Sequence, residues 1–269
     1  MPVTGGPMMH DFALTERFVV LYDLPVTFSA DAPAGAYPYA WNPEHPARVG
    51  LLPRSGPAAQ IRWFEVEPCW VFHTVNAYEH GETVVVDVCR YPSMFDVSAF
   101  RGAAPPSLDR WRLHLPTGRA THQRLHERAQ EFPRIDERRT AARHRFAYTM
   151  TTSRPELFGA GDELEHLPDD AFGNALLKHD LQTGTTQVHE VGRHAAVGEP
   201  VFVPASDDAE EDDGWVLSLV HDPELLVLDE PFSGLDPLGV EGMKTVVRDA
   251  AARGACVVFS SHQLDLVED

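Results

Sequence analysis

Short runs rich in β-branched and aromatic residues recur along roughly the first 220 residues, separated by turns that contain Gly, Pro, Asn or Asp. Ile61–Val66 and Thr83–Cys89 are typical of such runs, and Leu108–Leu115 alternates apolar and polar residues as a half-buried strand does. Short strands at this spacing favour a β-propeller or a sandwich. Further strands are predicted at 17–22, 48–53, 121–125, 145–149, 175–181, 185–189, 198–203 and 214–220.

Phe72–Glu79 lies between two of the predicted strands, and His80-Gly81 follows it as a turn. Within it, His73 has an aromatic neighbour on one side and an apolar stretch close by. A histidine in this setting is either a hydrogen-bonded core group or a metal ligand. Two other segments are predicted to lack regular structure: 29–46 as a long loop and 206–213 as an acidic, solvent-exposed turn.

The pattern changes near Pro223. Leu225–Leu228 is a short apolar run that is followed by two carboxylates, and it predicts a buried strand. A helix is predicted over 238–253, with Gly254 placed to end it, and a second apolar strand over 256–260. Strand, helix and strand in this order predict the parallel crossover of an α/β protein.

Composition limits the classes of function. The chain has 269 residues, enough for one large domain or two, and a formal net charge of −19. This charge argues against a nucleic-acid surface, which needs clustered Lys and Arg. The sequence contains neither a secretory signal pattern nor an apolar run long enough to span a membrane, and its three cysteines form no CxxC pair. We therefore expect a cytoplasmic protein with no integral membrane segment.

Four motifs occur in order along the first 220 residues. They are MMHDFALTERFVVLYDLPVTF at 8–28, WVFHTVNAYEHGETVVVDVCRY at 70–91, EFPRI at 131–135 and GEPVFVP at 198–204. Together they resemble the carotenoid cleavage oxygenase family. The resemblance implies a seven-bladed β-propeller in which four histidines hold a non-haem Fe(II). That iron activates O₂ to split a carbon–carbon double bond of a small apolar polyene.

The resemblance also implies roles for individual residues. His10 matches the second iron-binding histidine and His73 the third, whereas Glu131 and Glu199 match the carboxylates that steady the third and the fourth. The first and fourth histidines have no counterpart here, so we expect an incomplete propeller over 1–220 and impaired activity. The residue-level alternative is that both histidines are hydrogen-bonded core groups and both glutamates cap strand ends. No partner chain is indicated.

The residues after about 221 resemble a fragment of an ATP-binding cassette (ABC) ATPase. LLVLDEP resembles the Walker B segment, in which Asp229 would act through Mg²⁺ and Glu230 would polarise the attacking water. Asp236 matches the D-loop, and His262 matches the switch histidine. The sequence has neither a GxxxxGK[ST] loop nor an LSGGQ-like segment, so Mg-ATP binding is not expected. We interpret 221–269 as a fragment joined to the oxygenase-like part by gene fusion.

Three hypotheses follow: an Fe(II) dioxygenase, an ABC-type ATPase, and a catalytically inactive fusion product. Because the phosphate-binding loop is missing from the sequence, we expect Mg-ATP to leave the melting temperature of the chain unchanged. Thermal unfolding with and without Mg-ATP measures this. A rise in melting temperature that grows with nucleotide concentration would favour the ATPase hypothesis.

Overall fold

The computed structural model describes residues 3–30, 32, 37–96, 104–151, 174–192, 195–221, 225–228, 237–252 and 254–260. Most of the regular structure in these ranges is β, so the prediction of a mainly β fold is confirmed. The elements are β1 (Ala13–Leu14), β2 (Phe18–Asp23), β3 (Val26–Phe28), β4 (Tyr39–Trp41), β5 (Arg48–Pro53), η1 (Ala58–Gln60), β6 (Arg62–Glu65), β7 (Trp70–His80), β8 (Thr83–Tyr91), β9 (Ser107–His114), β10 (Arg119–His126), β11 (Gln130–Arg134), η2 (Glu137–Arg139), β12 (Phe146–Thr151), β13 (Ala175–Asp180), β14 (Thr185–Glu190), β15 (Ala196–Val197), β16 (Val201–Pro204), β17 (Gly214–Leu217), β18 (Val220–His221), β19 (Leu225–Leu228), α1 (Pro237–Ala252) and β20 (Cys256–Phe259).

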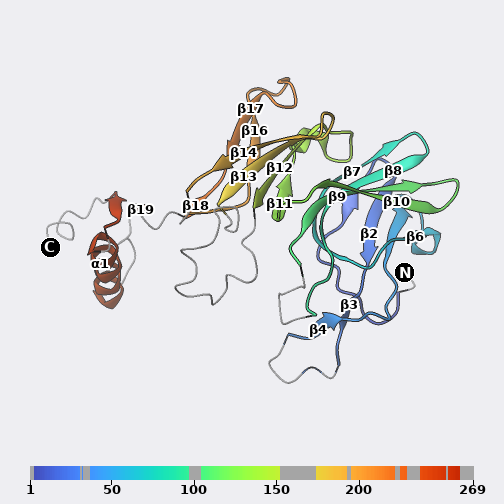
Figure 1. Cartoon of the computed structure of the whole chain (residues 1–269), viewed down its shortest axis with the longest axis horizontal. Helices are drawn as coiled ribbons and strands as arrows, with labels where there is room; N and C mark the ends of the chain where they lie inside the picture. Colours follow the sequence, from blue (N-terminus) through green and yellow to red (C-terminus); the bar gives the residue numbers. More distant parts are fainter. Residues whose placement is uncertain are drawn as a thin grey trace.

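Three four-stranded antiparallel sheets form the body of the described chain (Figure 1). The first sheet has the strand order β1-β2-β5-β6, the second β10-β9-β8-β7, and the third β11-β12-β13-β14. The second and third sheets are simple meanders, in which each strand pairs with the next along the chain. Successive four-stranded meanders are the architecture of propeller blades, and none of the described sheets closes on itself.

Apolar side chains hold the first and second sheets together. The shared core contains side chains from β2, β5 and β6 of the first sheet and from β7, β8 and β9 of the second. Among its fully buried members are Val20, Leu51, Phe64, Trp70, Val84, Val86, Val88 and Trp111. Nearly all of β8 is buried because both faces of this strand are covered. Cys69 and Cys89 are also part of the buried interior, since both are 0% exposed.

A smaller apolar cluster lies between the second and third sheets. Val75 of β7 and Leu108 of β9 pack there with Ile135 and with Ala147 of β12. β11 thereby lies beside β7, although the two strands belong to different sheets. This neighbourhood is what brings residues near 73 and residues near 131 to the same place.

Two sequence predictions of local structure were wrong. The segment Phe72–Glu79 is not a connection between strands but part of β7, the longest strand described, at 11 residues. The segment 29–46 is not wholly a loop, because β4 pairs with β3 as a hairpin. The hairpins β9–β10, β13–β14 and β16–β17 and the turn at Gly81, which has a φ of 60°, agree with the predictions.

The C-terminal elements have a different architecture. β19 pairs in parallel with β20, and α1 connects them, as the sequence predicts. Gly254, with a φ of 95°, follows the helix in the left-handed conformation that favours glycine. Figure 1 shows α1 and β19 apart from the three large sheets. No helix in the described ranges is both long and apolar enough to cross a membrane.

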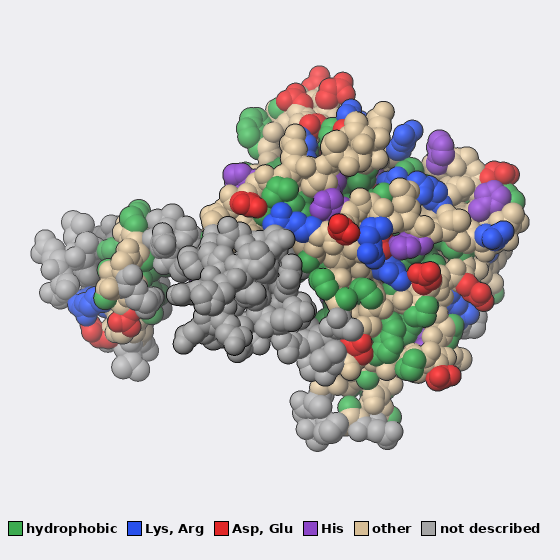
Figure 2. All heavy atoms as spheres, viewed as in Figure 1, with side chains coloured by type: hydrophobic (Ala, Val, Ile, Leu, Met, Phe, Trp, Pro, Cys, Tyr) green, Lys and Arg blue, Asp and Glu red, His purple; other side chains and the backbone are tan. Residues whose placement is uncertain are grey.

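An acidic turn joins β16 to β17. Figure 2 shows its carboxylates at one end of the molecule, and most of its residues are exposed as predicted. The turn is also held in place, because Arg138 donates to the carbonyl oxygens of Ser206, Asp207 and Ala209. The turn therefore packs on the η2 segment through an arginine, which the sequence prediction of a purely solvated turn did not include.

The buried core predicts a clear difference between two tryptophans. Trp111 is 1% exposed in the core between the first two sheets, whereas Trp215 on β17 is 60% exposed. We expect Trp111→Ala to lower the free energy of unfolding by about 3–5 kcal/mol, because it removes a large packed side chain and leaves a cavity. The matched control, Trp215→Ala, should change it by no more than about 0.5 kcal/mol. Urea unfolding of both variants measures this, and equal losses would contradict the described core.

Candidate metal centre

His73 is placed by an irregular edge strand. β7 lies at one end of the second sheet, and its pairing with β8 shifts register between Val71 and Thr74 and again between Thr74 and Asn76. Such irregularities re-aim side chains and are frequent beside active sites. The side chain of His73 is 29% exposed and faces the third sheet rather than the core. His73 is thus a hydrogen-bonded histidine that is partly exposed, and its role as a metal ligand stays a prediction.

Glu131 orients the His73 ring. Nδ1 of His73 lies 2.6 Å from Oε2 of Glu131, and the carboxylate is only 3% exposed. The same oxygen accepts a hydrogen bond of 2.8 Å from the backbone N–H of Phe132. A carboxylate on Nδ1 makes this nitrogen the donor, so Nε2 is left with its lone pair. His73 is thus held in the tautomer that a metal ion requires.

A bulge in β11 presents Glu131 to the second sheet. The pairing of β11 with β12 shifts register between Glu131 and Arg134, and Phe132 has a φ of 50°, a left-handed conformation that is costly for an aromatic residue. Pro133 follows, a residue that strands tolerate mainly at edges and bulges. The ring of Phe132 packs on the His73 ring at a centroid distance of 4.8 Å. The bulge therefore positions both the carboxylate and an aromatic wall.

His10 approaches the same place from the segment before β1. Its Nδ1 lies 3.0 Å from the carbonyl oxygen of Phe72, which can only accept, so Nδ1 carries the proton and Nε2 again stays free. The His10 and His73 rings are 5.1 Å apart between centroids and perpendicular. His10 is exposed, so it is not a core histidine. The structure brings together the two histidines that the sequence pairs.

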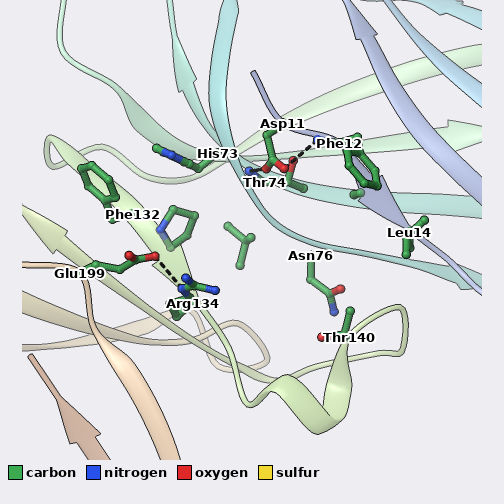
Figure 3. A pocket seen from close by; sticks show the side chains of 13 residues that line it. Asp11, Phe12, Leu14, His73, Thr74, Asn76, Phe132, Arg134, Thr140 and Glu199 are labelled. Carbon is green, nitrogen blue, oxygen red and sulfur yellow. Dashed lines mark hydrogen bonds and ion pairs between the residues drawn. The ribbon is translucent and has the colours of Figure 1, made fainter. Parts of the chain in front are cut away.

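A cavity of about 380 Å³ lies beside these groups. Figure 3 shows His73, Phe132 and Glu199 on one side of it and Asp11, Phe12 and Asn76 on another. Glu199 forms an ion pair with Arg134 at 2.7 Å, and both side chains are more than 40% exposed. Glu199 thus faces the cavity near His73 and contacts Arg134, and its role beside a fourth histidine stays a prediction.

The charges around His73 change its proton affinity. Burial alone would lower the pKa of His73, but the hydrogen bond and the negative charge of Glu131 outweigh burial and raise the pKa above its ordinary value. The charges of Asp11 and Glu199 act in the same direction. Burial also raises the pKa of Tyr91, and the nearby Glu131 charge adds to this effect. The carboxylates around His73 thus favour a positive charge at its ring.

The described residues fit part of an iron ligand set. Two imidazoles with free Nε2 atoms suit Fe(II), and a ring separation of 5.1 Å is compatible with two nitrogens each about 2 Å from one ion. Within the described ranges, no group of three or more His, Cys, Asp or Glu side chains gathers around one point. The described chain thus supplies two donors and an orienting carboxylate.

Sequence reasoning missed several residues that shape the site. Asp11 accepts hydrogen bonds from the backbone N–H groups of Phe12 and Thr74, at 2.7 and 2.8 Å. Thr74 also shares a hydrogen bond of 2.6 Å with the hydroxyl of Tyr22. Asp11 directly follows His10 in the sequence, and this signal could have found Asp11. Its bond to Thr74 gives no such signal, because Thr74 lies more than 60 residues away.

The remaining predicted residues have different outcomes. Asp229, Glu230, Asp236 and His262 lie outside the described residues, so their ATPase-like roles stay predictions. Two further histidines, His45 and His144, are buried outside the described strands. Each is less than 10% exposed and lies beside a buried carboxylate, Asp23 for the first and Asp87 for the second.

Comparisons with known proteins agree on one family. The family model described as "Retinal pigment epithelial membrane protein" matches residues 1–233, past the predicted boundary at 220. A carotenoid cleavage oxygenase of Mycobacterium tuberculosis is 39% identical over 261 residues, covering 80% of this chain and 50% of the relative. An isoeugenol monooxygenase of Pseudomonas putida is 33% identical, covering 93% of this chain and 54% of the relative. The chain thus spans about half the length of these curated relatives.

Solved structures give the same result. The cobalt-substituted apocarotenoid oxygenase (ACO) of Synechocystis matches with a TM-score of 0.66 and 27% identity. The match covers 80% of this chain and 44% of that chain. A chimera of the same ACO gives a TM-score of 0.66 as well. These neighbours support the mainly β, propeller-like architecture; they do not test the number of blades or the ATPase-like tail.

The His73–Glu131 bond predicts a pH-dependent stability. Because the pKa of His73 is raised in the folded chain, the bond stabilises the fold most below the ordinary histidine value of about 6.5, and this contribution is lost as pH rises through the folded pKa. We expect Glu131→Gln to lower the pKa of His73 and to destabilise the chain more at about pH 5.5 than at pH 8.

Histidine NMR titration and urea unfolding at the two pH values measure these effects. Glu199→Gln should lower the pKa of His73 less, since its charge acts without a hydrogen bond. Glu79→Gln is the matched control on β7, because Glu79 pairs with Arg17 away from His73. A His73 pKa that is unchanged in Glu131→Gln would contradict the described contact.

Proposed function

This chain belongs to the family of the retinal pigment epithelial membrane protein and the carotenoid cleavage oxygenases, and from that membership we propose that it forms part of a non-haem Fe(II) dioxygenase. Its reaction would split a carbon–carbon double bond of a polyene with O₂. The observation that carries the proposal is the perpendicular pair His10 and His73, each with Nδ1 already bonded and Nε2 free.

His10 and His73 would hold the iron through Nε2, and Glu131 would keep the His73 ring in place. When bound, Fe(II) supplies the activation of O₂. A carboxylate on Nδ1 raises the basicity of the ligand nitrogen and fixes the ring orientation. We further propose that Glu199, which forms an ion pair with Arg134, contributes its carboxylate to the site from the segment before β16.

The substrate class rests on the cavity and on the names of relatives. Apolar side chains from two directions border the cavity, those of Phe12 and Leu14 near β1 and that of Phe132 on β11. These side chains offer apolar surface to a flat conjugated hydrocarbon, beside charged side chains such as Asp11, Arg134 and Glu199. The relatives include carotenoid 9,10(9',10')-cleavage dioxygenases of Crocus sativus and Arabidopsis thaliana and an isoeugenol monooxygenase. We propose a small apolar polyene or a related conjugated alkene.

Further parts of the proposal concern the number of blades and the number of iron-binding histidines. We propose that the described sheets belong to a seven-bladed propeller and that the two histidines are half of a four-histidine set. Activity would then require the full set, because the loss of even one orienting partner costs about 10–100-fold in metal affinity or activity. A cytoplasmic location fits the free thiols of Cys69 and Cys89, which are both buried.

The C-terminal crossover of β19, α1 and β20 supports a second, independent proposal for 221–269. We propose that it descends from an ABC ATPase, with Asp229 and Glu230 after the first strand, and that it was joined by gene fusion. Without a phosphate-binding loop in the sequence, it would add no nucleotide-dependent activity.

Metal content tests the proposed function. We expect the purified chain to bind Fe(II), and His73→Ala to lose most of it, because one of two described imidazole ligands is removed. His80→Ala is the matched control, since His80 is an exposed histidine on the same strand. Iron analysis after anaerobic loading measures the difference. Equal iron in the two variants, or none in the parent chain, would overturn the assignment of this site.

A further inference from the structure

The segment His10–Phe12 lies along the outer edge of β7, where the second sheet ends. The carbonyl of Phe72 and the N–H of Thr74 flank His73, and backbone groups of alternate residues in a strand point to the same side. A neighbouring strand would normally bond to such a pair. Here two side chains do so instead. Nδ1 of His10 lies 3.0 Å from the Phe72 oxygen, and Oδ2 of Asp11 lies 2.8 Å from the Thr74 nitrogen.

Asp11 is the centre of this arrangement. Its second oxygen, Oδ1, accepts from the N–H of Phe12 at 2.7 Å, which fixes the side chain on its own backbone (Figure 3). Both carboxylate oxygens are therefore used by backbone donors. Hydrogen bonds to an ionised carboxylate are stronger than neutral ones, so this link is stiff. Thr74 extends it, because its hydroxyl bonds to that of Tyr22, which is 2% exposed in the first sheet.

We propose that Asp11 is a positioning residue, which sets where His10 stands relative to His73 and so prepares both imidazoles for one metal ion. This rests on the proposed function for the identity of the ion. We assign Asp11 a positioning role because each of its oxygens holds a backbone N–H group and no cluster of three donors surrounds it in the described chain. Asp11 acts by attaching the segment that carries His10 to β7 at Thr74, the residue next to His73.

The sequence separation of the two histidines explains why such a residue is needed. His10 and His73 are 63 positions apart, and His10 lies on an exposed segment outside any strand. The bond of His10 to Phe72 alone would allow its ring to swing about one contact. The Asp11 bond to Thr74 adds a second contact on the other side of His73, and the two contacts together fix the position of the His10 segment along β7.

The first test compares metal affinity with stability in the full chain. Asp11→Ala removes both accepting oxygens, and Asp11→Asn keeps the size but leaves one acceptor and adds a donor. We expect Co(II) or Fe(II) binding to weaken about 10–100-fold in Asp11→Ala and by less in Asp11→Asn. Visible absorption of bound Co(II) reports the geometry of the site, and thermal unfolding of each metal-free variant reports the fold.

Asp180→Ala is the matched control. Asp180 is a half-buried carboxylate that also accepts from backbone N–H groups, those of Gln182 and Thr183, in a turn of the third sheet. Its loss should lower the melting temperature at least as much as the loss of Asp11 but leave the Co(II) spectrum and affinity unchanged. Equal metal affinity in Asp11→Ala and the parent would overturn the proposal. If Asp11→Ala fails to fold, Asp11→Asn decides by the same comparison.

A metal-free measurement separates this proposal from the proposed function. In the parent chain His10 should be the Nδ1–H tautomer, because the Phe72 oxygen accepts its proton. ¹⁵N NMR of the neutral imidazoles should show this tautomer in the parent and its loss in Asp11→Ala. That result supports positioning by Asp11 even if the parent binds no iron, which would overturn only the proposed function. A His10 tautomer that is unchanged in both Asp11 variants would overturn the positioning role.

Discussion

The free edge of β7 is the constraint on which the rest of the site depends. An edge strand leaves backbone N–H and C=O groups that must find partners, and no described strand pairs with β7 on this side. Side chains take that place beside His73. His10 and Asp11 bond to the backbone on either side of His73, whereas farther along the strand the side chains of Asn76 and Glu79 bond to neighbouring segments. Specific side chains rather than a neighbouring strand thus satisfy the edge at Phe72 and Thr74, and this fixes the position of His10 along β7.

The third sheet contributes a carboxylate to this edge as well as packing. β11 lies beside β7, and its pairing with β12 is interrupted by the bulge between Glu131 and Arg134. The bulge turns Glu131 towards His73 and Phe132 onto its ring. The left-handed backbone of Phe132 costs free energy, and the bond from its N–H to the Glu131 carboxylate offsets part of that cost. The strained bulge of the third sheet thus helps to hold the His73 ring of the second sheet in place.

These features decide what the sequence could and could not predict. The strands and hairpins with regular alternation, such as β9–β10 and β13–β14, follow from local pattern. β7 was missed because its register shifts break the period of two, and because the polar residues His73, Asn76 and Glu79 interrupt its apolar pattern. The pair His73–Glu131 could be predicted from motifs alone, and the geometry agrees with it. The contact of Asp11 with Thr74 could not, because it joins two positions 63 residues apart through a backbone group, which leaves no mark on residue type.

The distribution of the site over the sheets bears on how a chain half as long as its relatives can hold a formed site. His10 precedes the first sheet, His73 lies on the second, Glu131 on the third, and Glu199 just before β16. Each is fixed by bonds to the adjacent sheet or segment: His10 to Phe72, His73 to Glu131, and Glu199 to Arg134. None of these bonds needs a metal ion or a further blade to form. The orientation of each of these side chains is therefore set locally, by one contact with a neighbouring residue. In the proposed metal site, the orientation of each imidazole and the number of ligands would be set by different parts of the fold, because Phe72 and Glu131 hold the two rings whatever else completes the coordination sphere.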